Sequence, residues 1–81
     1  MLSPKVAHRL TPRTPLEGAI LPPAEGSELA VTADYSPLWF DELRLRAGER
    51  VTFLCQICPG WFRGRQGGKV GVFPGTHVKL A

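Results

Sequence analysis

The sequence predicts a small all-β domain, an antiparallel barrel or sandwich of five short strands, preceded by a proline-containing tail. Apolar and polar residues alternate with period two in several short runs, and glycines and prolines separate these runs. No segment shows the apolar spacing of three and four that a helix of useful length requires. Five short strands joined by tight turns suit a closed or nearly closed sheet, which also removes exposed edges.

The chain divides into a tail, residues 1–27, and a body, residues 28–81. All seven aromatic residues lie at or after Tyr35, and five of the eight prolines lie at or before Pro23. The tail has too few apolar side chains to offset the entropy of ordering it, so we expect it to be flexible. The body is near the smallest size that folds alone on an apolar core.

Charge and hydropathy exclude several classes of protein. The net charge of +3 is only mildly basic, and the basic residues of the body alternate with apolar ones, as solvent-facing strand positions do. No apolar run approaches the roughly 20 residues that cross a bilayer. The first ten residues lack the apolar core of a signal peptide. We therefore expect a cytoplasmic protein with no membrane span.

The body can be followed strand by strand. Residues 29–35 alternate as a strand that ends at Tyr35, and Ser36-Pro37 interrupts it. Residues 38–42 form an irregular loop, after which alternation resumes at residues 43–46. A turn at Ala47-Gly48-Glu49 then leads into a strand over residues 51–55.

The last part of the body predicts a hairpin. Strands over Trp61–Arg65 and Val70–Phe73 are joined by Gly67-Gly68, which tolerates the positive φ angles of a tight turn. Pro74 ends the second strand because it has no N–H to donate. The cluster left near this exit is more apolar and aromatic than a small domain normally exposes, which suggests a binding face: Trp61, Val72, Pro74 and His77.

The same alternation predicts the core. We expect the following side chains to be buried: Val31, Leu43, Leu45, Val51, Phe53, Phe73 and Val78. Gly64 is expected to be small because a facing side chain needs the room.

One motif stands out in the tail. Arg9, Pro12 and Pro15 are spaced by three, so in a polyproline II helix they fall on one face. This is the Arg-x-x-Pro-x-x-Pro pattern that proline-recognising grooves accept. The segment is either a plain linker or a ligand for such a groove.

The residues give little support to metal, cofactor or catalytic chemistry. Cys55 and Cys58 form a Cys-x-x-Cys pair, but a zinc site needs four ligands and a redox pair usually opens a helix. Here Pro59-Gly60 leads into another strand, so we interpret the pair as two free thiols. No nucleophile and base are suitably spaced, and no glycine loop cradles a phosphate. We expect no enzyme activity, no metal and no cofactor.

Four blocks of the body, in order and at matching spacing, resemble the signature of a Src homology 3 (SH3) domain. They are Val31–Tyr35, Asp41–Leu45 followed by Gly48-Glu49, Gly60–Phe62, and Gly71–Val78. The resemblance covers roughly residues 28–81. It implies a five-stranded, partly open barrel with a long loop between its first two strands and a shallow groove that binds proline-rich peptides.

The resemblance also implies the site. Tyr35, Trp61 and Pro74 keep the groove residues expected of the family, and Glu42 with Asp41 would receive a ligand's arginine or lysine. A flat indole packs well on proline rings, and a carboxylate beside it fixes the direction of the peptide.

The sequence departs from the family where Ala33 and His77 replace the usual aromatic residues, and Val72 and Thr76 stand at two further unusual positions. One proline pocket should therefore be wide and weakly aromatic. Trp39 and Phe40 either supply extra apolar contact outside the groove or fold back onto the barrel.

The prediction is a non-catalytic, monomeric interaction module of the adaptor or signalling type that binds proline-rich segments with atypical specificity. Because tail and groove are complementary in charge, the tail could occupy the groove in cis or a neighbour's groove in trans. The alternative is a small basic barrel that binds RNA. Asp41 and Glu42, which adjoin the aromatic cluster, argue against it because they would repel phosphate.

Overall fold

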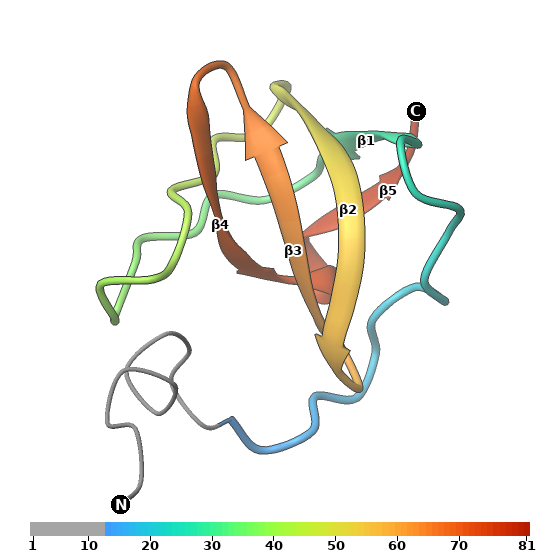
Figure 1. The fold of residues 1–81 in the computed structure, drawn as a ribbon, viewed down its shortest axis with the longest axis vertical. Coiled ribbons are helices and arrows are strands. Elements are labelled where there is room, and N and C mark those ends of the chain that lie inside the picture. The colour runs from blue at the N-terminus through green and yellow to red at the C-terminus, as the bar shows by residue number, and fades with distance from the viewer. Residues whose placement is uncertain (1–12) are drawn as a thin grey trace, which may run out of the picture.

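The structure, a computed structural model, describes residues 13–81. One five-stranded sheet coils into an incompletely closed barrel in which every neighbouring pair of strands is antiparallel and the strand order is β4-β3-β2-β1-β5 (Figure 1). The strands are β1 (Glu28–Val31), β2 (Arg50–Cys58), β3 (Trp61–Gln66), β4 (Lys69–Pro74) and β5 (Val78–Leu80), with a 3-10 turn, η1 (Gly75–His77), before β5. The predicted all-β, SH3-like fold class is confirmed.

The β3–β4 hairpin forms as its glycines predict. Gln66 pairs with Lys69, so Gly67-Gly68 is a two-residue turn, and Gly67 has a φ of 60° that favours glycine. Gly64 is small for the expected reason. A Cβ there would lie 2.7 Å from Cε2 of Phe73 and 2.7 Å from the carbonyl oxygen of Thr52.

The strand assignment differs from the prediction in three places: β1 ends at Val31 rather than at Tyr35, β2 extends to Cys58, and the strand expected at residues 43–46 does not form. Leu43 and Leu45 are buried as alternation requires, but their segment makes only isolated bridges, from Tyr35 to Leu45 and from Glu42 to Val72. The fifth strand is instead β5, which pairs with β1. The alternation identified the buried positions correctly, whereas ladder pairing depends on a neighbouring backbone that the local sequence does not reveal.

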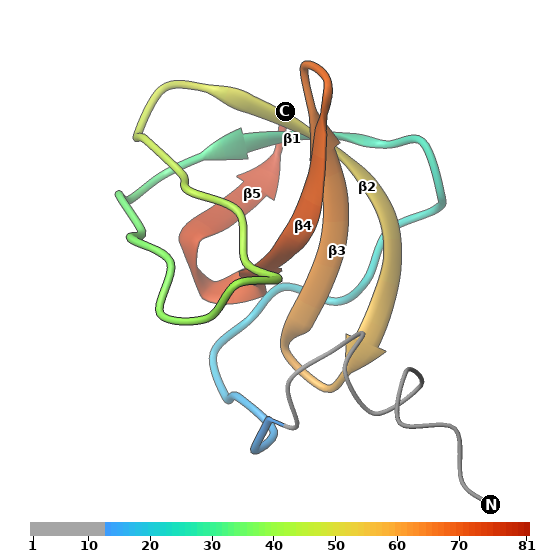
Figure 2. The same ribbon diagram turned by 60° about the vertical axis from the view of Figure 1, so that its left-hand side comes forward.

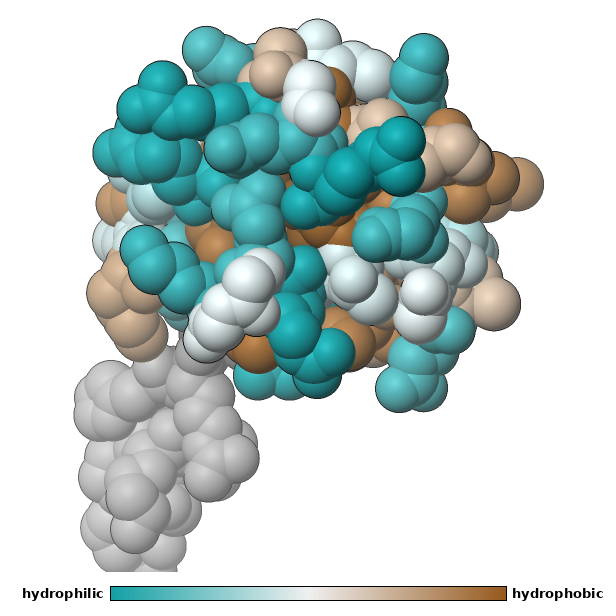
Figure 3. Space-filling view, turned by 90° about the horizontal axis from the view of Figure 1, so that it is seen from above, coloured by the Kyte–Doolittle hydropathy of each residue, from teal (hydrophilic) through white to brown (hydrophobic). Residues whose placement is uncertain are grey.

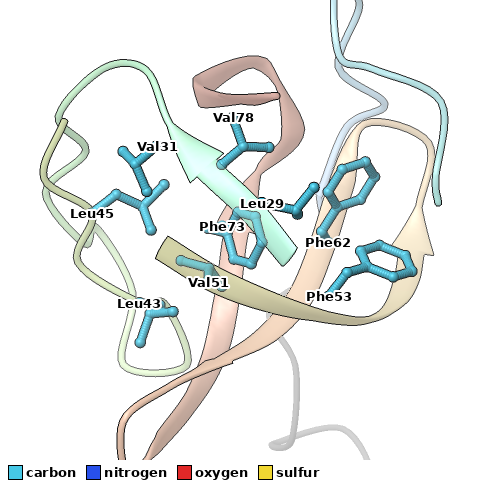
Figure 4. Close-up of a cluster of buried hydrophobic side chains, with 9 residues drawn as sticks. All are labelled: Leu29, Val31, Leu43, Leu45, Val51, Phe53, Phe62, Phe73 and Val78. Atoms are coloured by element: carbon cyan, nitrogen blue, oxygen red, sulfur yellow. The ribbon is translucent and has the colours of Figure 1, made fainter. Parts of the chain in front are cut away.

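The core fills the inside of this curved sheet (Figure 4). All seven predicted core residues are buried, and Leu29, Phe62 and Val72 join them. Phe62 stands edge-on between Phe53 and Phe73, with ring centroids 5.0 Å and 6.0 Å away. Such edge-to-face contacts add to the stabilisation that burial provides.

Residues 13–27, which we call the strap, lie along the outside of the barrel (Figures 1 and 2). The Leu16 N–H donates to the Pro59 carbonyl at 2.9 Å, and the Gly26 N–H donates to the Phe53 carbonyl at 2.8 Å. At Gly60, where φ is 86°, a Cβ would collide with the Leu16 backbone. The strap therefore passes closely beneath the β2–β3 turn before it reaches β1.

The end of the barrel that carries the β3–β4 turn is predominantly hydrophilic (Figure 3). All seven basic residues of the body are exposed: Arg44, Arg46, Arg50, Arg63, Arg65, Lys69 and Lys79. This agrees with their interpretation as solvent-facing positions.

Candidate functional site: an arginine pocket beside an aromatic groove

The loop between Tyr35 and Leu45 carries the two acidic residues and is attached to the edge of β4. The Val72 N–H donates to the Asp41 carbonyl, and the Leu43 N–H donates to the Val72 carbonyl, both at 2.8 Å. These bonds satisfy edge groups of β4 and place Asp41 and Glu42 at the side of the sheet. Backbone bonds to β4 therefore fix the position of the loop segment that carries these two acidic side chains.

Glu42 is the centre of a hydrogen-bond network. One carboxylate oxygen, Oε1, accepts from the Tyr35 hydroxyl at 2.7 Å, the Leu38 N–H at 2.7 Å and the Trp39 N–H at 3.4 Å. The other, Oε2, accepts from Nη2 of Arg13 at 3.0 Å. Because its side chain is only 1% exposed, these donors replace the water that the carboxylate loses.

The network shifts the ionisation of its members. Burial alone would raise the pKa of Glu42, but the bonds from Leu38, Tyr35 and Arg13 stabilise the carboxylate, and the pKa falls below its usual value. Burial, and then the hydrogen bond to Glu42, raise the pKa of Tyr35. Burial would lower the pKa of Arg13, but its bonds to Asp41 and Glu42 outweigh this effect and raise it.

The carboxylates of Asp41 and Glu42 and the ring of Trp61 form what we call the arginine pocket. Arg13, from the strap, fills it. Its Nη2 lies 2.8 Å from Oδ1 of Asp41 and 3.0 Å from Oε2 of Glu42, and its side chain is 4% exposed. Its guanidinium carbon is 5.1 Å from the centroid of the Trp61 ring, within the range of a cation–π interaction.

Trp61 also holds the strap through its polar edge. The indole Nε1 donates to the Thr14 carbonyl at 3.1 Å, one residue after Arg13. The Cys58 thiol donates weakly to the Arg13 carbonyl, at 4.0 Å. Side chain and backbone of this short segment are therefore both engaged at the pocket.

The aromatic part of the groove adjoins the arginine pocket. The ring of Tyr35 meets Trp61 and His77 edge-on, with centroids 6.4 Å and 5.5 Å away. Nδ1 of His77 is 2.8 Å from the Thr76 hydroxyl. Pro74 pairs with Trp61 across the β3–β4 ladder and is fully buried. Tyr35, Asp41, Glu42, Trp61 and His77, which are predicted site residues, therefore lie together.

Three other predicted residues lie elsewhere. Val72 is completely buried and takes part through its backbone bonds to the acidic loop, so its side chain offers no surface to a ligand. Trp39 and Phe40 are 53% and 78% exposed and do not fold back onto the barrel. Phe40 borders an open hollow of about 570 Å³ between the acidic loop and strands β2, β3 and β4, lined by Phe40, Asp41, Cys55, Ile57, Arg63, Val70, Gly71 and Val72.

The predicted ligand residues of the tail are only partly covered. Arg9 and Pro12 lie outside the described residues, and Pro15 is exposed. Sequence reasoning missed Arg13, since the spacing of the prolines directed attention to Arg9. Arg13 lies within the Arg-x-x-Pro-x-x-Pro motif, residues 9–15. Which of the two arginines reaches the carboxylates depends on the path of the strap from β1.

Two further observations concern the part of the chain that the structure describes. Within residues 13–81, no three His, Cys, Asp or Glu side chains gather closely enough to hold a metal ion. No helix in the same range is both long and apolar enough to cross a membrane.

Comparison with known proteins identifies the family. Residues 31–79 match the variant SH3 domain family, and the chain belongs to it. SH3 domains are non-catalytic modules that bind peptide segments of other proteins.

Individual relatives agree with this assignment. The chain is 31% identical over 83 residues to mouse neutrophil cytosol factor 4, covering 95% of this chain and 24% of that protein. It is 44% identical over 50 residues to human mitogen-activated protein kinase kinase kinase 11, covering 56% of this chain and 6% of that protein. The chain thus spans less than a quarter of the length of these relatives.

Solved structures show the same fold. The SH3 domain of yeast NBP2 superimposes with a TM-score of 0.67 at 28% identity, covering 69% of this chain and 98% of that domain. The Acanthamoeba myosin I SH3 domain bound to Acan125 superimposes with a TM-score of 0.66 at 26% identity, covering 72% of this chain and all of that domain.

Proposed function

We propose that this domain is a non-catalytic module that binds proline-rich segments of partner proteins. Asp41 and Glu42 receive the ligand's basic residue, and Tyr35, Trp61 and His77 form the part of the groove that contacts its prolines, with the buried Pro74 supporting Trp61 across the β3–β4 ladder. The observation that carries this proposal is the arginine pocket itself. A guanidinium already lies between two carboxylates and an indole there, which is the arrangement a basic ligand residue requires.

The aromatic half of the groove supports a preference that differs from that of a common SH3 domain. A polyproline II ligand is already extended, so its rings pack on Tyr35 and Trp61 at little entropic cost. Ala33 is exposed and His77 is half-buried, where the family usually has aromatic rings. We expect the proline pocket that these two positions wall in the family to be wider here, with the imidazole of His77 as a polar group in its wall.

The exposed side chains of Trp39 and Phe40 extend the binding surface beyond the groove. Phe40 lines the hollow next to Asp41, and Asp41 also belongs to the arginine pocket. A ligand residue next to the arginine would pass directly over this hollow. Apolar contact there compensates in part for the weak aromatic pocket.

The strap is an internal occupant of the site. Arg13 is close to Glu42 in space but 29 residues away in sequence, and a tether of this kind raises its effective concentration without requiring high intrinsic affinity. We propose that docking is in cis in a monomer. Exchange between two copies would make the same contacts in trans. A cytoplasmic location remains a prediction.

The contacts around Trp61 argue against the RNA-binding alternative. A single-strand site needs exposed aromatic rings interleaved with free cations. Here the aromatic cluster adjoins Asp41 and Glu42, and the arginine beside it is held by both.

Binding of a synthetic Arg-x-x-Pro-x-x-Pro peptide, measured by calorimetry and amide chemical shifts, tests the proposal. We expect micromolar binding with shifts at Tyr35, Glu42 and Trp61, and loss of binding in Trp61→Ala. Arg65→Ala, an exposed change on the same strand, serves as the control and should bind normally. Absence of peptide binding together with a salt-sensitive mobility shift with single-stranded RNA would favour the alternative.

A further inference from the structure

We propose that Arg13 is a specificity-determining residue, which selects against arginine-bearing ligands by filling the pocket they need. This inference rests on the proposed function and adds a rank order of ligands to it. Peptides that rely on an arginine must displace Arg13, whereas peptides that bind through their prolines alone leave it in place.

The pocket accommodates one guanidinium. The side chains of Arg13, Asp41 and Glu42 are 4%, 7% and 1% exposed, so the three groups already exclude water from one another. Oε1 of Glu42 is occupied by donors of its own loop, and Oε2 accepts from Arg13. A second cation in contact with the same carboxylates would be repelled by the first. Occupation by Arg13 and by a ligand's arginine is therefore mutually exclusive.

The strap makes its ion pairs and its bond to the indole at the acidic end of the groove, and it also reaches η1, where the Ile20 N–H donates to the Gly75 carbonyl at 3.4 Å. Arg13 and Thr14 meet the acidic pair and the indole edge, and Leu16 continues to Pro59, beneath the β2–β3 turn. Tyr35 adjoins both parts of the groove, since its ring meets Trp61 and His77 edge-on and its hydroxyl donates to Glu42. Because the ion pairs of Arg13 are with Asp41 and Glu42, the strap competes with the arginine of a ligand for the same charged groups.

Competition by a tethered group lowers the apparent affinity of the ligand it mimics. The apparent Kd of an arginine-bearing peptide is its intrinsic Kd divided by the fraction of molecules whose pocket is open. Because the strap is also held by backbone bonds at Leu16 and Gly26, Arg13 returns to the pocket from a short distance. With effective concentrations in the millimolar range, we expect a handicap of about fivefold or more.

Four dissociation constants test the inference. The wild-type chain and Arg13→Gln are each titrated with an Arg-x-x-Pro-x-x-Pro peptide and with the same peptide carrying citrulline, a neutral isostere, in place of arginine. In Arg13→Gln we expect the arginine peptide to bind about fivefold tighter or more, and the citrulline peptide to change by less than about twofold. Arg65→Ala removes the same charge from an exposed position and should keep the wild-type ratio.

The outcomes separate the two proposals. Equal gains for both peptides would show that the strap blocks the whole groove, and no gain for either would show that Arg13 does not compete. Both results overturn the specificity role while leaving the peptide-binding function intact. Binding of neither peptide to either protein would overturn the proposed function, and this inference with it. An amide spectrum of Arg13→Gln confirms that the barrel is folded.

Discussion

Replacing Glu42 with glutamine is expected to lower the free energy of unfolding by about 2–3 kcal/mol. Glutamine keeps one carbonyl oxygen for the donors Tyr35 and Leu38 but presents an amide N–H group to Arg13, where Oε2 accepts at 3.0 Å. A hydrogen bond to a charged group contributes roughly 1.5–3 kcal/mol. The bonds that remain also weaken, because a neutral acceptor is a poorer one than a carboxylate.

Urea unfolding followed by tryptophan fluorescence measures this change. With a slope of about 1 kcal/mol per molar urea, the midpoint should fall by about 2–3 M. Glu49→Gln is the matched control, since Glu49 is exposed and accepts one bond from Gln66 at 3.1 Å, and it should cost less than about 0.5 kcal/mol. Equal midpoints for the two variants would refute the argument that the buried carboxylate organises the loop.

The same effect has a defined pH dependence. The pKa of Glu42 lies below its usual value, so its carboxylate is favoured in the folded state. The resulting stability is present above the ordinary glutamate pKa of about 4.3 and disappears as the pH falls through the lower folded value. The difference between wild type and Glu42→Gln should therefore shrink as the pH is lowered below about 4.3. A difference that persists undiminished in acid would contradict this assignment.

Two further predictions follow from individual contacts. Tyr35 is the only tyrosine, so phenolate absorbance reports its ionisation alone. Because burial and the bond to Glu42 raise its pKa, Tyr35 should stay protonated above about pH 10. In Glu42→Gln it should ionise at a lower pH than in the wild type. Gly64→Ala should cost about 1–3 kcal/mol, because its Cβ would lie 2.7 Å from the Thr52 carbonyl, whereas Gly68→Ala has open space and should be near neutral in the same urea assay.

Much of the barrel was accessible from the sequence because its signals are local. Period-two alternation identified buried positions such as Val31 and Phe53, and Gly67-Gly68 identified the hairpin turn. The strand assignment failed at Leu43–Leu45, where the residues are buried but the backbone pairs with neighbours at single positions. Burial is encoded in side-chain pattern, whereas ladder formation depends on which backbone lies alongside.

The candidate site likewise has residues that the sequence identified and features that it did not reveal. Tyr35, Asp41, Glu42 and Trp61 were identified through the resemblance to the SH3 signature blocks, and the structure brings them together. The complete burial of Val72 was missed because its neighbours in space come from a loop 30 residues earlier. The exposure of Phe40 could not be decided from sequence, since loop side chains follow no periodicity.

The sequence by itself determined that this is a small β barrel with an acidic pair and a groove tryptophan, because hydrophobic period, turn residues and the order of blocks are properties of the chain. It also showed that a proline- and arginine-bearing tail precedes the barrel. Only the tertiary structure decided that Arg13 occupies the arginine pocket. That choice depends on the length and path of the strap from β1 around the barrel, which are set by contacts between segments far apart in sequence.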